Sequence, residues 1–199
     1  MLIAFCGLPA SGKTTLAAKI FANFKQLELK SELVVEQARF YIANKRINEQ
    51  LPLDSKILLT DSDQLKIMDM QQKMENTMKY GTSLDTLIVS DSSTVNAALY
   101  LTESSFNKFK PVIVESLKRY DQILFCHSFL DDVDESDLNR IHSREQILAL
   151  KPRSLELLKL CKENNRNTFE LLGAMSLEAK YKEACSAILD THLLLQKCS

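Results

Sequence analysis

The residues near the start of the chain whose types and spacing could do chemistry are two glycines, a lysine and a threonine. Residues 7–14 read GLPASGKT and fit the pattern G-x-x-x-x-G-K-[ST], in which the backbone N–H groups of a glycine-rich turn bind phosphate oxygens. We expect Lys13 to reach the β- and γ-phosphates of a nucleotide, and the hydroxyl of Thr14 to ligate Mg²⁺. The residues expected to contact the nucleotide are Gly7, Ala10, Ser11, Gly12, Lys13, Thr14 and Thr15.

The segments on either side of this motif are of the kind that a phosphate loop requires. Residues 2–6 form a short apolar run typical of a buried strand, and residues 16–21 have the pattern of an amphipathic helix. A helix that begins near Lys13 adds unpaired N–H groups and the positive end of its dipole to the loop. A chance match in a surface loop is the alternative, and the strand–loop–helix order argues against it.

A carboxylate at a second strand end extends the candidate site. Residues 86–90 form an apolar run that ends at Asp91, which is the strand-then-aspartate form of a Walker B motif. An acid in this position can hold Mg²⁺, often through water, beside the phosphates. Asp91 could instead cap a helix that begins near Ser93, and the two roles can coexist.

Glu36 is the second acid with a possible role in chemistry. It follows the β-rich run 33–35, so it can face the γ-phosphate from the acceptor side and accept or orient the proton of an attacking hydroxyl. Arg39 lies one helical turn further on and could bind an anionic acceptor. The alternative is a surface ion pair between these two residues, with no role in chemistry.

Two arginines stand four residues apart in the polar segment 131–144, which we interpret as a short lid. A guanidinium that closes over transferring phosphate stabilises the charge on its oxygens, so Arg140 and Arg144 are candidates for that role. A solvated basic face that balances the nearby acids Asp132, Asp134, Glu135 and Asp137 explains either arginine equally well.

The order of strands and helices predicts an α/β fold. Five strands are expected, at residues 2–6, 33–36, 86–91, 122–126 and 168–173. The helices expected between and after them lie at 37–46, 64–79, 93–101, 111–119 and 177–189, and a further helix after the segment 131–144 is expected to break or restart at Pro152 and to end at about 163. Strands separated by helices form a parallel sheet covered on both faces. We therefore predict a P-loop NTPase three-layer sandwich, a five-stranded parallel sheet within one domain, 1–199. Ligands of such sheets bind beyond the carboxyl ends of the strands.

Composition limits the classes of function. The 199 residues are 45% hydrophobic and 26% charged, with a net charge of −1, as in an ordinary globular protein. This charge provides no global basic field for nucleic acid or anionic membranes. Five scattered cysteines without a C-x-x-C pair are typical of reduced thiols. We expect a cytoplasmic protein with no signal peptide, no membrane span and no nucleic-acid partner; the oligomeric state, a homodimer included, stays open.

Several motifs together resemble one family. The glycine loop, the run VVEQARFY at 34–41, the IVSD run at 88–91 and the LNR triplet at 138–140 resemble the ribosylnicotinamide-kinase-type P-loop ATPases and, more broadly, nucleoside and nucleotide kinases. The resemblance implies that Glu36 and Arg39 line an acceptor pocket, that Asp91 serves magnesium or the acceptor, and that Arg140 belongs to a lid. The chain differs from the family in having a single acid at the third strand and no tryptophan.

The function expected from these residues is that of an ATP-dependent kinase. With Mg²⁺, it would transfer the γ-phosphoryl group to a small nucleoside- or nucleotide-like acceptor, with Lys13, Glu36, Asp91, Arg140 and Arg144 as the catalytic set. Three alternatives remain: a P-loop NTPase that only hydrolyses, a nucleotide-sensing module without turnover, and a kinase acting on a modified base in DNA.

Overall fold

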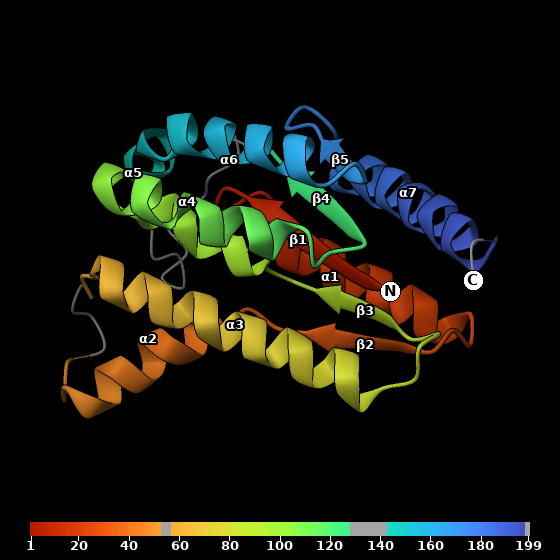
Figure 1. Ribbon diagram of the computed structural model, residues 1–199, viewed down its shortest axis with the longest axis horizontal. Coiled ribbons are helices and arrows are strands. Elements are labelled where there is room, and N and C mark those ends of the chain that lie inside the picture. Colours follow the sequence, from red (N-terminus) through yellow and green to blue (C-terminus); the bar gives the residue numbers. More distant parts are fainter. Residues whose placement is uncertain (53–56, 128–142, 198–199) are drawn as a thin grey trace.

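The protein, seen here as a computed structural model that describes residues 1–52, 57–127 and 143–197, is built on one parallel β-sheet (Figure 1). Its strands are β1 (Leu2–Gly7), β2 (Ser31–Val34), β3 (Leu87–Ser90), β4 (Gln122–Cys126) and β5 (Thr168–Leu171). They lie in the order β2-β3-β1-β4-β5, and every neighbouring pair is parallel. The carboxyl ends of all five strands therefore share one edge, with β1 in the centre.

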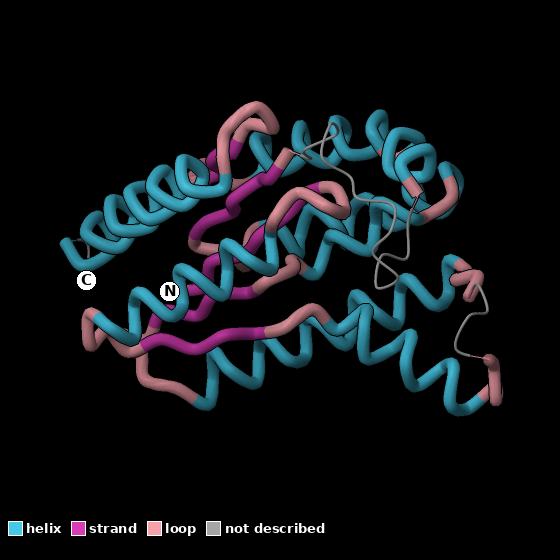
Figure 2. The backbone as a smooth tube through the Cα atoms, turned by 180° about the vertical axis from the view of Figure 1, so that it is seen from behind, coloured by secondary structure: helices cyan, strands magenta, loops and turns pink. Residues whose placement is uncertain are grey.

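Helices cover both faces of the sheet because its strands are apolar on both faces. Helices α1 (Lys13–Gln26) and α7 (Leu177–Lys197) pack on one face, which Figure 2 shows from the front. Helices α3 (Asp61–Gly81), η1 (Thr94–Tyr100), α4 (Glu103–Leu117) and α6 (Lys151–Asn164) cover the other. The predicted three-layer sandwich with a five-stranded parallel sheet is confirmed.

Two further helices lie outside these layers. Helix α2 (Gln37–Asn48) follows β2 and packs against α3, and the short α5 (Arg144–Ala149) precedes α6. The restart expected near Pro152 occurs, since α6 begins at Lys151 with Pro152 in its first turn. The segment expected as a lid, 131–144, falls outside the described residues except for its last two positions.

Strand β2 ends earlier than the sequence predicts. It spans Ser31–Val34, whereas the expected run was 33–36, so Glu36 lies beyond the strand at the N-cap position of α2. The partners of β2 explain this limit: Ser31 to Val34 pair with Leu87 to Ser90, and β3 ends at Ser90.

The prediction that a helix begins at Pro111 is wrong. Helix α4 begins eight residues earlier, at Glu103, and Pro111 lies inside it. The hydroxyl of Thr102 caps this start by accepting a hydrogen bond from the N–H of Ser105, and the carboxylate of Asp61 in turn binds Thr102. A capped and anchored start, with Phe106 and Ile113 buried on one face, outweighs the hydrogen bond that proline removes.

Helix α3 packs on the core through an apolar stripe. Ile67 is buried, and Met74 and Met78 pack against the core. The same helix, however, also buries the polar side chains of Gln71 and Glu75, which hydrophobic periodicity does not predict.

The described helices and cysteines bear on the expected absence of a membrane span and on the expected reduced thiols. No helix of the described chain is both long and apolar enough to cross a bilayer. Among these residues Cys6, Cys126, Cys161 and Cys185 are free thiols.

Candidate functional site

The glycine loop turns the chain sharply at the carboxyl end of β1. Gly7 has a φ of 123° and Gly12 a φ of 83°, both in the region that favours glycine. At Gly7 a side chain is also excluded by space, because a Cβ atom would lie 2.2 Å from the carbonyl oxygen of Cys126 on β4. Glycine is thus required here by both conformation and contact.

The loop leads straight into the N-terminus of α1. Gly12 is the N-cap residue and has no side chain that could cap this end. The first N–H groups of any α-helix have no partner within the helix, and here, together with the helix dipole, they form an anion-binding site.

Lys13 lies over this loop. Its ammonium donates to the carbonyl oxygens of Gly7 (3.1 Å) and Leu8 (2.6 Å) and lies 3.4 Å from the hydroxyl oxygen of Ser11. An ammonium held in this position can exchange these neutral oxygens for phosphate oxygens, which are stronger partners because they are charged.

Asp91 is where the other candidate residues meet. It directly follows β3 and is 5% exposed. Burial raises the pKa of its carboxyl group, and the nearby charge of Glu36 raises it further, whereas a hydrogen bond with the Thr14 side chain and the charges of Lys13 and Arg39 lower it. Four residues selected from the sequence, up to 78 positions away along the chain, therefore lie near enough to Asp91 to influence its pKa.

The donor set around Asp91 fits a magnesium ion. Thr14 and Asp91 supply a hydroxyl and a carboxylate, which are hard oxygen ligands, and the Thr14 side chain is close enough to lower the pKa of Asp91. The described residues contain no group of three His, Cys, Asp or Glu side chains that could hold a metal by themselves. A Mg²⁺ held by Thr14 and Asp91 would take its remaining ligands from phosphates and water.

Glu36 occupies the N-cap position of α2, but its side chain makes no capping hydrogen bond. Its carboxylate instead lies 3.4 Å from Nε of Arg39, in an ion pair whose side chains are 29% and 67% exposed, respectively. The surface pair considered as the alternative role is therefore present. The negative charge of Glu36 also raises the pKa of Asp91, so the pair lies near the carboxyl end of β3.

The other residues selected from the sequence are the two lid arginines and two positions of the glycine loop. Arg144 is the exposed first residue of α5, and Arg140 lies outside the described residues. Ala10 has a φ of 56° within the loop, and Thr15 is exposed on the first turn of α1.

His127, which directly follows β4, behaves as a polar residue at a strand end. Its Nε2 lies 2.9 Å from the carboxylate of Glu170 on β5, and its backbone oxygen accepts a hydrogen bond from the buried ammonium of Lys180 on α7. These contacts join the two strands and α7 next to the loop.

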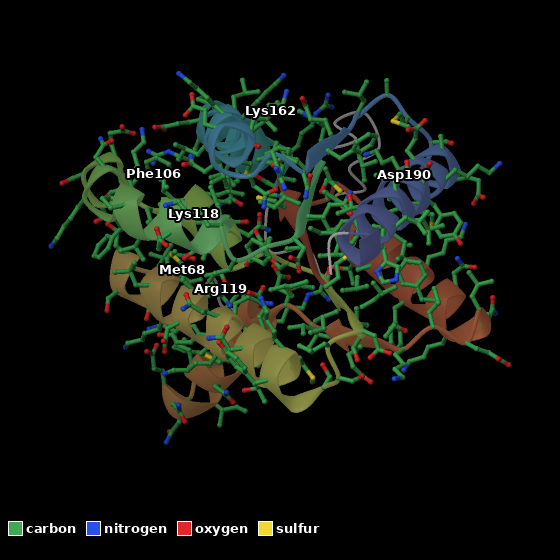
Figure 3. All side chains as sticks on the ribbon, turned by 45° about the vertical axis from the view of Figure 1, so that its right-hand side comes forward. Met68, Phe106, Lys118, Arg119, Lys162 and Asp190 are labelled. Atoms are coloured by element: carbon green, nitrogen blue, oxygen red, sulfur yellow. The ribbon has the colours of Figure 1, made fainter. Side chains whose placement is uncertain are left out.

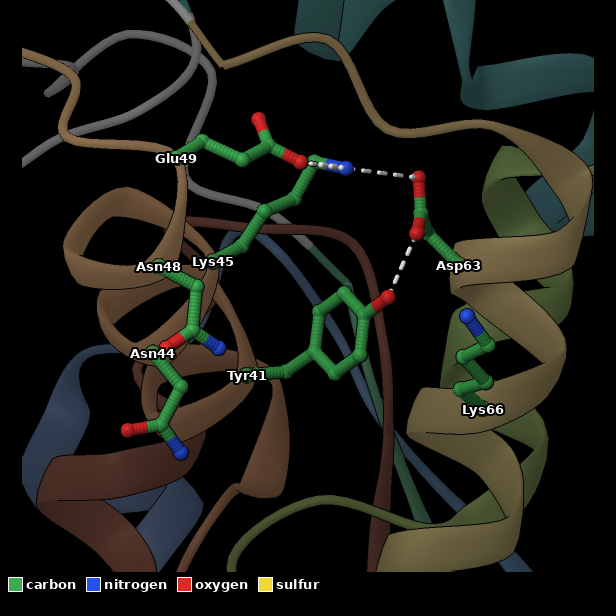
Figure 4. A pocket seen from close by; sticks show the side chains of 7 residues that line it. All are labelled: Tyr41, Asn44, Lys45, Asn48, Glu49, Asp63 and Lys66. Atoms are coloured by element: carbon green, nitrogen blue, oxygen red, sulfur yellow. Dashed lines mark hydrogen bonds and ion pairs between the residues drawn. The ribbon is translucent and has the colours of Figure 1, made fainter.

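A groove of about 320 Å³ lies between α2 and α3 (Figure 4). Across it, the hydroxyl of Tyr41 and the ammonium of Lys45 both bind Asp63, and Lys45 also pairs with Glu49 at 2.8 Å. Burial pushes the pKa of Asp63 upward, but hydrogen bonds from Tyr41 and Thr60 outweigh it and hold the pKa at about 2. This paired cluster fixes the outer part of α2 to the start of α3.

Comparison with known proteins identifies the family. The family model described as an AAA domain matches residues 2–172, most of the chain. The chain belongs to this AAA-domain family.

Solved structures similar to this AAA domain share its fold. Two structures of NadR protein, one in complex with NR and one with NAD and AMP-PNP, match 96% of the chain at 15% and 16% identity, with TM-scores of 0.62 and 0.61. The AAA domain spans about half the length of those chains, 51% and 49%.

Two shorter proteins align over nearly their whole length. A gluconokinase from Sinorhizobium meliloti has 17% sequence identity and a TM-score of 0.53, and the alignment covers 99% of this chain and 96% of the gluconokinase. A deoxyadenosine kinase from M. mycoides with bound dCTP has 14% sequence identity and a TM-score of 0.55, and the alignment covers 96% of this chain and 100% of that kinase. No curated protein sequence matches. The AAA domain therefore has a P-loop kinase-like fold.

Sequence reasoning missed Asn96, which anchors the glycine loop. Asn96 lies buried in η1, and its Oδ1 accepts hydrogen bonds from the N–H of Gly7 (3.0 Å) and the thiol of Cys6. Its Nδ2 donates to the hydroxyl of Ser92, next to Asp91. Asn96 thus connects the loop to the segment that follows β3, and no motif or periodicity could have selected it.

Proposed function

We propose that this AAA domain is an ATP- and Mg²⁺-dependent kinase that transfers the γ-phosphoryl group to a small nucleoside- or nucleotide-like acceptor. The observation that supports this best is the meeting of Lys13, Thr14 and Glu36 around the buried Asp91. Phosphoryl transfer requires mostly positioning and charge stabilisation, and these residues supply both. The proposal treats 1–199 as one domain and places it in the cytoplasm.

On the donor side, the loop amides and Lys13 would bind the phosphates of ATP. The ammonium of Lys13 already lies over the loop, 2.6 Å from the carbonyl oxygen of Leu8. Thr14 and Asp91 would hold Mg²⁺, which supplies charge neutralisation between the β- and γ-phosphates when bound. Since burial raises the pKa of Asp91, its carboxylate gains from pairing with a cation.

On the acceptor side, Glu36 would orient the attacking hydroxyl or accept its proton. Its carboxylate makes no cap bond to its own helix and is partly exposed, so an acceptor can reach it. Arg39, the more exposed member of the pair, would bind an anionic group of the acceptor. Arg144, together with Arg140, would stabilise charge on the transferring group.

The similar structures support a nucleoside-like acceptor. NadR protein was solved in complex with NR, and the deoxyadenosine kinase with dCTP bound. Both proteins are distant from this chain, at 15% and 14% identity, so the acceptor is part of the proposal.

The substitution Glu36→Gln tests the acceptor side. We expect a fall in kcat of about 10²- to 10⁴-fold, the usual contribution of a general base, with the Kd for ATP unchanged because the loop is intact. Glu32→Gln on β2 is the matched control, since Glu32 is also partly exposed and paired, with Lys25, and its kcat should stay at the wild-type value. A collapse of ATP affinity in Glu36→Gln would assign this acid to the donor side instead.

A further inference from the structure

Helix α3 carries a buried polar chain that joins the two proposed acids of the site. Gln71 and Glu75 lie one turn apart on the same face of α3, and they are 3% and 0% exposed. Buried polar groups are costly unless they are hydrogen-bonded. The hydrogen-bond partners of Gln71 and Glu75 therefore show what holds these two side chains in place.

Gln71 uses both ends of its amide. Its Oε1 accepts a hydrogen bond from the N–H of Gln37 (2.9 Å), and its Nε2 donates to the hydroxyl of Ser90 (3.0 Å). Gln37 directly follows Glu36, and Ser90 directly precedes Asp91. One side chain therefore spans the backbone neighbours of both acids.

The bond to Gln37 satisfies a donor at the end of a helix. Gln37 is the first residue of α2, and its N–H has no partner within the helix. Gln71 reaches across from α3 to accept this hydrogen bond. The carboxylate of Glu36 makes no capping hydrogen bond to α2, so it stays available to the site.

At the other end, Glu75 fixes the serine that Gln71 binds. The carboxylate of Glu75 lies 2.9 Å from the hydroxyl oxygen of Ser90 and accepts hydrogen bonds from Thr94 and Tyr120, at 3.0 Å each. Arg119, labelled in Figure 3 beside α3, lies 3.5 Å from the same carboxylate. These contacts hold the side chain of Ser90 in one position in the core.

We propose that Gln71 is a positioning residue, which sets the place of Glu36 relative to Asp91 by holding the start of α2 against the end of β3. This inference rests on the proposed kinase function. A helix start that lost this contact would move Glu36 away from the acceptor hydroxyl, and displacements of about 1 Å in a reacting geometry cost up to about 10²-fold in rate.

The test is steady-state kinetics of Gln71→Met, which keeps the length of the side chain and removes both hydrogen bonds. We expect kcat to fall about 10- to 100-fold, while the Kd for ATP stays within about twofold of wild type because the glycine loop is untouched. Gln72→Met, at the neighbouring partly buried position on α3, is the control and should keep the wild-type kcat.

A double-mutant cycle separates positioning from general destabilisation. If Gln71 acts through Glu36, then Gln71→Met should lower kcat little or not at all when added to Glu36→Gln. Equal losses in both backgrounds, or a loss of ATP binding, would overturn the proposal. Ser90→Ala, which removes the fixed partner of Gln71, should lower kcat in the same direction and decides the matter if Gln71→Met does not fold.

The outcomes also separate this inference from the function on which it rests. If wild type phosphorylates an acceptor and Gln71→Met does so at the same rate, only the role of Gln71 fails. If wild type transfers label to no acceptor, the proposed function fails, and the positioning role fails with it.

Discussion

Asp91 shows how one residue combines a structural cost with a proposed function. Its carboxylate is buried, and burial raises its pKa above the usual value of an aspartate. The folded protein therefore binds a proton at Asp91 more tightly than the unfolded chain does, so the charged form costs stability at neutral pH and this cost disappears as the pH falls through the raised pKa. A bound cation would offset the same cost.

The substitution Asp91→Asn should consequently separate stability from metal binding. We expect the free energy of unfolding at neutral pH to rise, because the neutral amide removes the cost of a buried charge, and Mg²⁺ binding to the ATP complex to weaken at least tenfold. In wild type, Mg²⁺ affinity should fall as the pH drops through the raised pKa of Asp91, because the proton competes with the metal.

Thermal unfolding and Mg²⁺ titration at several pH values measure both effects. Asp69→Asn is the control, since Asp69 is exposed and pairs with Lys73 on the surface of α3. A variant of Asp91 that is less stable than wild type, yet binds Mg²⁺ normally, would contradict this account.

Lys13 permits an equally direct prediction. Lys13→Ala should lower phosphoryl transfer by at least about 10²-fold, because the transferring charge loses its nearest cation. Lys25→Ala, at the far end of α1 and paired with Glu32, should keep its activity in the same labelled-ATP assay. Full activity in Lys13→Ala would remove the donor site assigned to the loop.

At the residue scale, the sequence predicts residues whose chemistry has a fixed spacing or a fixed place on a strand. The glycine loop, Glu36 and Asp91 follow from such patterns, and the structure brings them together. Asn96 and Gln71 could not be predicted, because they act through contacts 89 and 34 residues away along the chain. Only the folded chain makes them neighbours of the site.

At the scale of elements, α3 is the element that ties the proposed acceptor side to the sheet. Its apolar residues pack on the core, and between them Gln71 and Glu75 form the polar chain to α2, β3 and η1. Hydrophobic periodicity predicts where this helix lies. It cannot predict the polar face, which is stable only because its partners come from other elements.

Removal of the Glu75 carboxylate tests how much the buried polar side chains of α3 contribute to the stability of the protein. Burial raises the pKa of Glu75, and Arg119 with three hydroxyl groups partly offsets that effect. Glu75→Leu would leave the guanidinium of Arg119 without its buried partner, so we expect a loss of about 3–5 kcal/mol in the free energy of unfolding.

Urea denaturation measures this loss. Glu115→Leu on α4 is the control, because Glu115 is 75% exposed, and it should change stability by no more than about 0.5 kcal/mol. A midpoint for Glu75→Leu that equals that of wild type would show that the buried chain adds nothing to stability.

The position of α4 shows the limit of local signals for elements. Pro111 is a favourable residue for the first turn of a helix, yet α4 starts at Glu103, where Thr102 is held by Asp61 of α3. A tertiary contact therefore decides the start of the helix. Such contacts explain why the sequence predicts the existence of the helices better than their bounds.

At the scale of the whole molecule, the strand order β2-β3-β1-β4-β5 determines which residues can meet. It places β1 between β3 and β4, so the glycine loop lies between Asp91 at the end of β3 and His127 at the end of β4. Helix α2 brings Glu36 to the same edge from the far side of β3. The sequence predicts a parallel sheet, and this order then explains why residues from separate parts of the chain form one site.

We propose that this edge of the sheet transfers phosphate to an acceptor and does not merely hydrolyse ATP. The most direct measurement is incubation of the protein with γ-labelled ATP and Mg²⁺ against a panel of nucleosides, nucleoside monophosphates and ribosylnicotinamide, with Lys13→Ala as the negative control. We expect label to appear on one acceptor class and Lys13→Ala to abolish it. If label is found only as free phosphate, whichever acceptor is present, the protein is a hydrolase and the proposed kinase function is wrong.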